Sequence, residues 1–175
     1  MSVVEARFRA REPRVVTRGR AGTTIDKKGH RMAGRMLTSR EDIATVAREA
    51  KCVAVLGIKT EEQAGQPAFY VPEYLKQAGL QLIPIPVYYP KATEILGFPV
   101  VRRVQDAAGE VDILDVFRRP EDLNQHLADI VAKKPRCVWL QSGIRNDAFA
   151  QALLASDIDV VQDRCLMVEL RYVGK

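Results

Sequence analysis

Short runs of apolar residues recur along this chain and alternate with segments that have helical patterning. A run that is apolar without interruption is typical of a strand buried on both faces of a parallel sheet. Strands that alternate with helices are typical of βαβ units, whose crossover connections are right-handed. The sequence therefore predicts an α/β fold: a Rossmann-like, doubly wound and mainly parallel sheet, in three layers, within a single domain. The expected strands are 52–58, 80–87, 111–116, 137–140 and 158–161.

The helices expected before and between these strands begin or end at recognisable residues. Thr38 and Ser39 supply hydroxyl caps, acidic residues follow in the first turn, and apolar residues from Ile43 onward recur at helical spacing. Further helices, each bounded by Pro, Gly or a polar cap, are expected at 68–78, 121–132 and 146–155.

The ligand of such a sheet binds beyond the carboxyl ends of the strands, where the strand order reverses. After Gly57, Lys59 and Thr60 could hold a phosphate by charge and hydroxyl, and the next helix offers free N–H groups. The next glycine is Gly65, so the G-x-G-x-x-G fingerprint of dinucleotide sites is absent. An ordinary strand-to-helix turn is the alternative. The loops expected to form the site follow Gly57, Pro86, Val116 and Leu140.

The net charge of +5 is distributed unevenly along the chain. Residues 1–40 contain eleven basic and three acidic residues, whereas residues 41–175 contain sixteen and nineteen. The basic character therefore belongs to an N-terminal arm, 1–37, which we expect to be flexible, and not to the domain at 38–175. This distribution argues against a nucleic-acid partner for the domain, and the alternative is that the basic arm contacts nucleic acid while the α/β domain serves as a scaffold.

Compartment and metal chemistry are also constrained by the sequence. No apolar run reaches the roughly 18 to 20 residues of a membrane span, and residues 1–30 lack the apolar segment of a signal peptide. We therefore expect a cytoplasmic protein with no membrane contact.

The three cysteines lie in or beside apolar runs and lack the paired spacing of a zinc site; they are Cys52, Cys137 and Cys165. We expect buried thiols and no metal. His30 and His126 are both expected to be exposed.

Several segments, taken in their order and spacing, resemble the family of small CoA-binding proteins. The fold of this family matches the CoA-binding domain of the succinyl-CoA synthetase alpha subunit. The most specific segments are Phe-Arg-Arg-Pro at 117–120 and Trp-Leu-Gln-Ser-Gly at 139–143. The resemblance covers about residues 40–172, and its segments are 53–57, 67–75, 83–86, 111–120, 138–144 and 163–165.

The resemblance implies that the ligand is coenzyme A or an acyl-CoA. It implies that residues 57–60 line the phosphate end of the site and that Ala68 and Phe69 begin the helix beneath it. An aromatic ring at Phe117 suits adenine, and a guanidinium at Arg118 suits phosphate. The implied ligand-binding residues are Gly57, Ile58, Lys59, Thr60, Ala68, Phe69, Pro86, Phe117, Arg118, Gln141 and Gly143.

Two departures and one alternative accompany this assignment. Where much of the family has Val-Asn-Pro, this chain has Ile85-Pro86-Val87 followed by two tyrosines, so an adenosine contact there must come from backbone or the tyrosines. Ala68 stands where serine is frequent in the family, which removes a phosphate contact. The structural alternative is that Phe117 completes the core and that Arg118 or Arg119 pairs with a neighbouring carboxylate such as Asp115 or Glu121. Trp139 is expected in the core, and Asp163 and Arg164 as a buried pair.

We expect binding without catalysis. Acyl-CoA synthetases of the nucleoside-diphosphate-forming type, as a family, pass a phosphoryl group through a histidine of a second domain, which this sequence does not contain. No catalytic residue is therefore assigned. A partner protein or a second copy of this chain is left open, and the rival class is an NAD(P)-dependent oxidoreductase or another nucleotide-binding enzyme that uses the same crevice.

Overall fold

The computed structural model describes residues 33–175, together with the strands β1 (Thr17–Arg18) and β2 (Thr24–Ile25). The chain divides into two units, 1–32 and Ala33–Lys175. In the first unit, β1 and β2 pair in antiparallel fashion. The predicted flexibility of the arm at 1–37 falls mostly outside the described residues.

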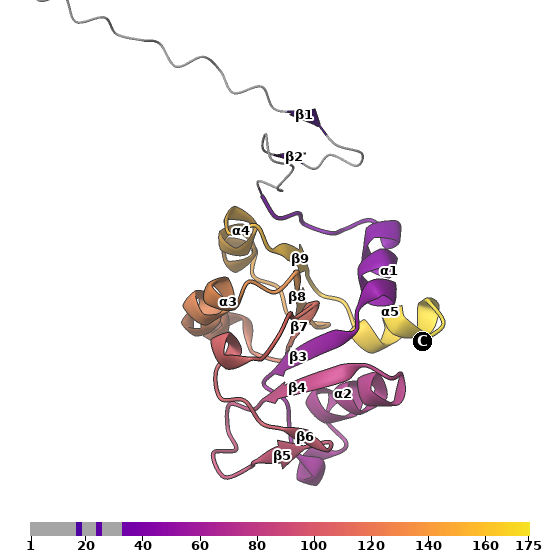
Figure 1. Cartoon of the computed structure of the whole chain (residues 1–175), viewed down its shortest axis with the longest axis vertical. Helices are drawn as coiled ribbons and strands as arrows, with labels where there is room; N and C mark the ends of the chain where they lie inside the picture. Colours follow the sequence, from indigo (N-terminus) through magenta and orange to yellow (C-terminus); the bar gives the residue numbers. More distant parts are fainter. Residues whose placement is uncertain (1–16, 19–23, 26–32) are drawn as a thin grey trace, which may run out of the picture. The chain divides into compact units, whose positions relative to one another are not determined.

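The second unit contains a sheet of five parallel strands (Figure 1). Its spatial order is β4-β3-β7-β8-β9. The first strand of this sheet in the sequence, β3, therefore lies between the second, β4, and the third, β7. The strand order therefore reverses between β3 and β7, which is where a parallel sheet opens a crevice. The predicted doubly wound α/β fold is confirmed. The strands are β3 (Cys52–Leu56), β4 (Gln81–Ile85), β7 (Ile113–Val116), β8 (Cys137–Leu140) and β9 (Asp159–Val161).

Helices cover both faces of this sheet. Along β3, Val53 and Val55 belong to one buried core, whereas Ala54 and Leu56 belong to the other. This alternation explains why the strand is apolar at every position. The first core is completed by α1 (Arg40–Glu49), α2 (Pro67–Gln77) and α5 (Leu166–Tyr172), and the second by α3 (Leu127–Lys133) and α4 (Asp147–Ala155).

Several elements differ from the sequence prediction. The helix expected at 121–132 begins as a 3₁₀ helix, η3 (Pro120–His126), before it becomes α3. A two-strand hairpin, β5 (Glu94–Ile95) and β6 (Phe98–Pro99), was not predicted, nor was α5. A further 3₁₀ turn, η2 (Val104–Asp106), packs against α3. These elements are too short to show a periodic pattern in the sequence.

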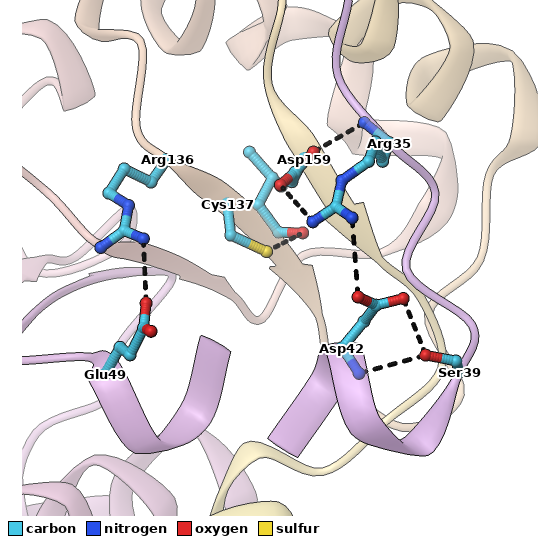
Figure 2. Close-up of polar contacts among 8 residues, drawn as sticks. Arg35, Ser39, Asp42, Glu49, Arg136, Cys137 and Asp159 are labelled. Carbon is cyan, nitrogen blue, oxygen red and sulfur yellow. Dashed lines mark hydrogen bonds and ion pairs between the residues drawn. The ribbon is translucent and has the colours of Figure 1, made fainter. Parts of the chain in front are cut away.

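The compact unit begins before the predicted helix cap at Thr38 and Ser39. Ser39 is the N-cap of α1, as expected, and its Oγ accepts the Asp42 amide. Upstream, the Arg35 amide donates to Asp159 in β9 at 2.6 Å, and its guanidinium forms ion pairs with Asp159 and Asp42 (Figure 2). A Cβ at Gly34 would overlap the Ile158 carbonyl, so only glycine fits there. Residues 34–37 are therefore fastened along the outer edge of β9.

Candidate functional site

The turn after β3 meets the end of β7 at the point where the strand order reverses. Gly57 has a φ of +88°, and a Cβ added to it would lie 2.6 Å from the Phe117 carbonyl oxygen and 3.2 Å from Cδ of Arg118. The Gly57 amide donates to the Ile85 carbonyl at the end of β4. A side chain at this position would therefore push the ends of β3 and β7 apart.

The loop from Gly57 to α2 is closed by its own hydrogen bonds. The Lys59 amide donates to the Ala68 carbonyl at 3.0 Å, and Thr60 Oγ1 donates to Gln63 in the 3₁₀ turn η1 (Glu61–Gln63). The Tyr89 hydroxyl donates to the same Gln63 oxygen at 2.8 Å. Lys59 and Thr60 are half-buried, so both residues remain partly accessible to solvent.

Several predicted site residues can reach a ligand only through their backbone. Ile58 and Phe69 are buried in the first core, and Ala68 and Pro86 are buried as well. Pro67 stands at the first position of α2, where a missing N–H is tolerated. The positive end of the helix dipole at this terminus favours an anion.

Tyr88, which follows β4, places an aromatic ring beside two cations. The residue is 56% exposed. Lys59 Nζ lies 5.2 Å from the Tyr88 ring centre, and the Arg118 guanidinium carbon lies 5.1 Å from it. Lys59 is also 5.6 Å from the ring of Tyr89. Two cations from two strand ends thus converge on one ring.

Arg118 is buried, although it carries a charge. One guanidinium nitrogen donates to the Tyr88 hydroxyl at 2.9 Å, and another donates to Asp122 at 3.1 Å. Its Nε is buried and has no hydrogen-bond partner among the described residues. An ion pair was the structural alternative. Arg118 pairs with Asp122, which was not named from sequence, whereas Arg119 pairs with Glu121 at 3.5 Å, as that alternative stated. The neighbouring Arg119 shares Asp122 and is 70% exposed.

Gln141 lies at the end of β8 and is tied to a buried acid. Its Nε2 donates to Oδ1 of Asp115 at 2.8 Å, and Asp115 has no exposed surface. Burial raises the pKa of Asp115 to about 8, although this hydrogen bond and one from the Val116 amide lower it. The other carboxyl oxygen, Oδ2, has no partner among the described residues. Asp115 was not predicted as a site residue, and its only signal is an acid inside an apolar run.

Two expectations for polar residues are wrong. Asp163 and Arg164 are both exposed and do not form the expected buried pair. Asp163 instead accepts the Gly143 amide at 2.7 Å, and Arg164 pairs with Glu169. His126 is half-buried, not exposed, and its Nε2 is buried without a partner in the described chain. Burial and then the charge of Arg118 lower the pKa of His126.

The structure therefore brings part of the predicted site together. Gly57, Phe117 and Arg118 are in contact, and Lys59 approaches them across the Tyr88 ring. Gln141 and Gly143 follow β8, the next strand of the sheet. Neither Asp122 nor His126 was assigned to the site from sequence, and Tyr88 was mentioned only as one of two tyrosines after β4.

A family model described as CoA binding domain matches residues 51–171, which include all of these strand ends. The chain belongs to this CoA-binding domain family. The chain is 27% identical, over 130 residues, to the uncharacterized protein YneT of Bacillus subtilis (strain 168), covering 74% of this chain and 93% of that protein. The alignment thus spans most of both proteins.

Solved structures share the fold of this CoA-binding domain. The structure of cell-free ID.343 from Thermus thermophilus superimposes with a TM-score of 0.72 at 40% identity, covering 78% of this chain and 99% of that one. A hypothetical protein from Pyrococcus horikoshii OT3 gives a TM-score of 0.69 at 22% identity, covering 79% and 94%. The second likeness concerns the fold alone.

None of the helices in the described part of the chain is long and apolar enough to cross a membrane. Within the same residues, no three His, Cys, Asp or Glu side chains are grouped as metal ligands.

Proposed function

We propose that this protein binds coenzyme A or an acyl-CoA in the crevice at the carboxyl ends of β3 and β7. The proposal rests on the fact that two independent findings point to the same place in the fold. The family match names CoA, and the cationic and aromatic groups of the matched segment converge where the strand order reverses.

The phosphates would lie against the turn at residues 57–60. Its backbone approaches closely because Gly57 has no side chain, and the N-terminus of α2 adds a positive dipole. The Lys59 ammonium group adds a positive charge on a flexible side chain, which could approach a phosphate. Arg118 offers its unpartnered Nε or exchanges the Tyr88 hydroxyl for a phosphate oxygen.

The adenine ring would stack on Tyr88. The Tyr88 ring is large and more than half exposed, and it lies beside both cations. This arrangement compensates for the amide side chain that the end of β4 lacks in this chain. The proposed role is binding. We place the protein in a reducing compartment such as the cytoplasm, because its free thiols would persist there; they belong to Cys52, Cys137 and Cys165.

Two adjacent arginines provide the test. We expect Arg118→Ala to weaken CoA binding about tenfold or more, because a buried guanidinium that meets phosphate contributes roughly 1.5 to 3 kcal/mol. Arg119→Ala is the matched control, since Arg119 shares the carboxylate of Asp122 but is mostly exposed. It should change CoA affinity less than about threefold. Calorimetric titration measures both.

The two variants also separate binding from folding. Loss of Arg118 leaves Asp122 with Arg119, so we expect a cost of about 1 to 2 kcal/mol in unfolding free energy, measured by urea denaturation. Equal CoA affinity in Arg118→Ala and the wild type would refute this placement of the ligand.

A further inference from the structure

A cleft lies beyond the end of β9, at the same edge of the sheet as the turn after Gly57. Its volume is about 390 Å³, which is in the range of small-molecule sites. Met36, Leu37 and Ile43 supply apolar lining, and the loops after β8 and β9 supply Arg145, Asp163 and Arg164. The cleft is therefore apolar on one side and mainly basic on the other.

One wall of this cleft is built by the segment before α1. Met36 pairs with Val160 as a parallel bridge, and the Leu37 amide donates to the Val160 carbonyl at 2.8 Å. Arg35 fastens the same segment to β9 and α1 (Figure 2). These wall residues precede the family match, which begins at residue 51. The cleft is thus held in place by a part of the chain that the family model does not include.

The basic side of the cleft is available to a ligand. Arg145 pairs with Asp147 at 3.0 Å, but both side chains are about two-thirds exposed, at 66% and 67%. Ion pairs of this kind contribute little and exchange readily. Arg164 is 47% exposed and pairs with Glu169. Asp163 uses one carboxylate oxygen to accept the Gly143 amide. A carboxylate entering the cleft could take a bidentate contact from a guanidinium.

The distance from the proposed CoA site suits one continuous ligand. Between β3 and β9 lie β7 and β8, so three strand spacings of roughly 4.8 Å separate their ends by about 14 Å. The pantetheine arm of CoA has about the backbone length of four extended residues, which is also about 14 Å. A thioester whose phosphates lie at residues 57–60 would reach the mouth of this cleft.

We infer that the cleft binds the acyl group of an acyl-CoA that carries a carboxylate at its far end. The methylene chain lies on Met36, Leu37 and Ile43, and the carboxylate is held by Arg145, with Arg164 beside it. This inference rests on the proposed function, because the CoA moiety delivers the acyl group.

The test compares two thioesters of equal chain length, glutaryl-CoA and pentanoyl-CoA, with free CoA as the reference. Calorimetric titration of the full chain should give at least about fivefold tighter binding of glutaryl-CoA than of pentanoyl-CoA. Arg145→Ala should abolish this preference, and Arg145→Lys should retain part of it. Arg48→Ala, an exposed arginine of α1 that does not line this cleft, is the matched control and should keep the preference.

The outcomes separate this inference from the proposed function. If CoA binds but the two thioesters bind equally, or if Arg145→Ala keeps the preference, the acyl site is refuted and CoA binding stands. If neither CoA nor either thioester binds, both proposals fail. A preference lost in Arg145→Ala, with unchanged affinity for free CoA, supports the acyl site specifically.

Discussion

Gln141 Nε2 donates a 2.8 Å hydrogen bond to Oδ1 of Asp115, and both side chains are buried at the ends of neighbouring strands. Since burial raises the pKa of Asp115 to about 8, its carboxyl group is mostly protonated at neutral pH. A neutral acid explains how an acidic side chain can lie in the interior of the sheet without a cation beside it.

The protonation of Asp115 should make stability depend on pH. Between about pH 4 and pH 8, the unfolded chain has released a proton that the folded protein retains, so the free energy of unfolding should fall as pH rises. Asp115→Asn removes this titration. Urea denaturation at pH 5, 6, 7 and 8 should show a smaller decline for the variant than for the wild type. Parallel pH profiles would show that Asp115 is ionised in the folded state.

Gly57 should tolerate no side chain. Gly57→Ala places a Cβ 2.6 Å from the Phe117 carbonyl oxygen at a φ of +88°, so we expect a loss of at least about 2 kcal/mol in unfolding free energy. Gly65→Ala, in the same loop, is the control. No atom lies within 4 Å of a Cβ there, and its φ is not positive. Chemical denaturation measures the difference, and equal stability of the two variants would contradict the close approach.

Tyr88 should contribute to binding through its ring. Tyr88→Leu should weaken CoA binding about fivefold to tenfold, because stacking on an aromatic side chain is typically worth about 1 to 3 kcal/mol per base. Tyr88→Phe keeps the ring and loses only the hydroxyl that accepts from Arg118. It should retain most of the affinity. Titration with 4′-phosphopantetheine, which has no adenine, should not distinguish Tyr88→Leu from the wild type. A loss for both ligands would mean that the substitution disturbs the loop.

The strands of the sheet could be predicted because burial on both faces leaves a strong signal. The run at 137–140 coincides with β8, and 111–116 and 158–161 contain β7 and β9. The β5–β6 hairpin could not be predicted, because its turn uses Leu96 and Gly97, both with positive φ, instead of the usual Asn-Gly or Asp-Gly. The Trp139 side chain is in the core, as expected.

The candidate site could be predicted only in part, because long-range contacts determine what each side chain does. Sequence position alone places Arg118 at a strand end, but it does not show that Tyr88, thirty residues away, supplies a hydrogen bond and a ring. The burial of Asp115 likewise depends on the helices packed over the sheet. The Gly57 turn was identified because its position after an apolar run is a local feature.

We propose that the carboxyl ends of β3 and β7 recognise coenzyme A. Calorimetric titration of the full chain with CoA, acetyl-CoA, NAD and NADP tests this recognition. We expect CoA and acetyl-CoA to bind at least about tenfold more tightly than NAD or NADP. Tight binding of NAD or NADP without measurable binding of CoA would contradict it.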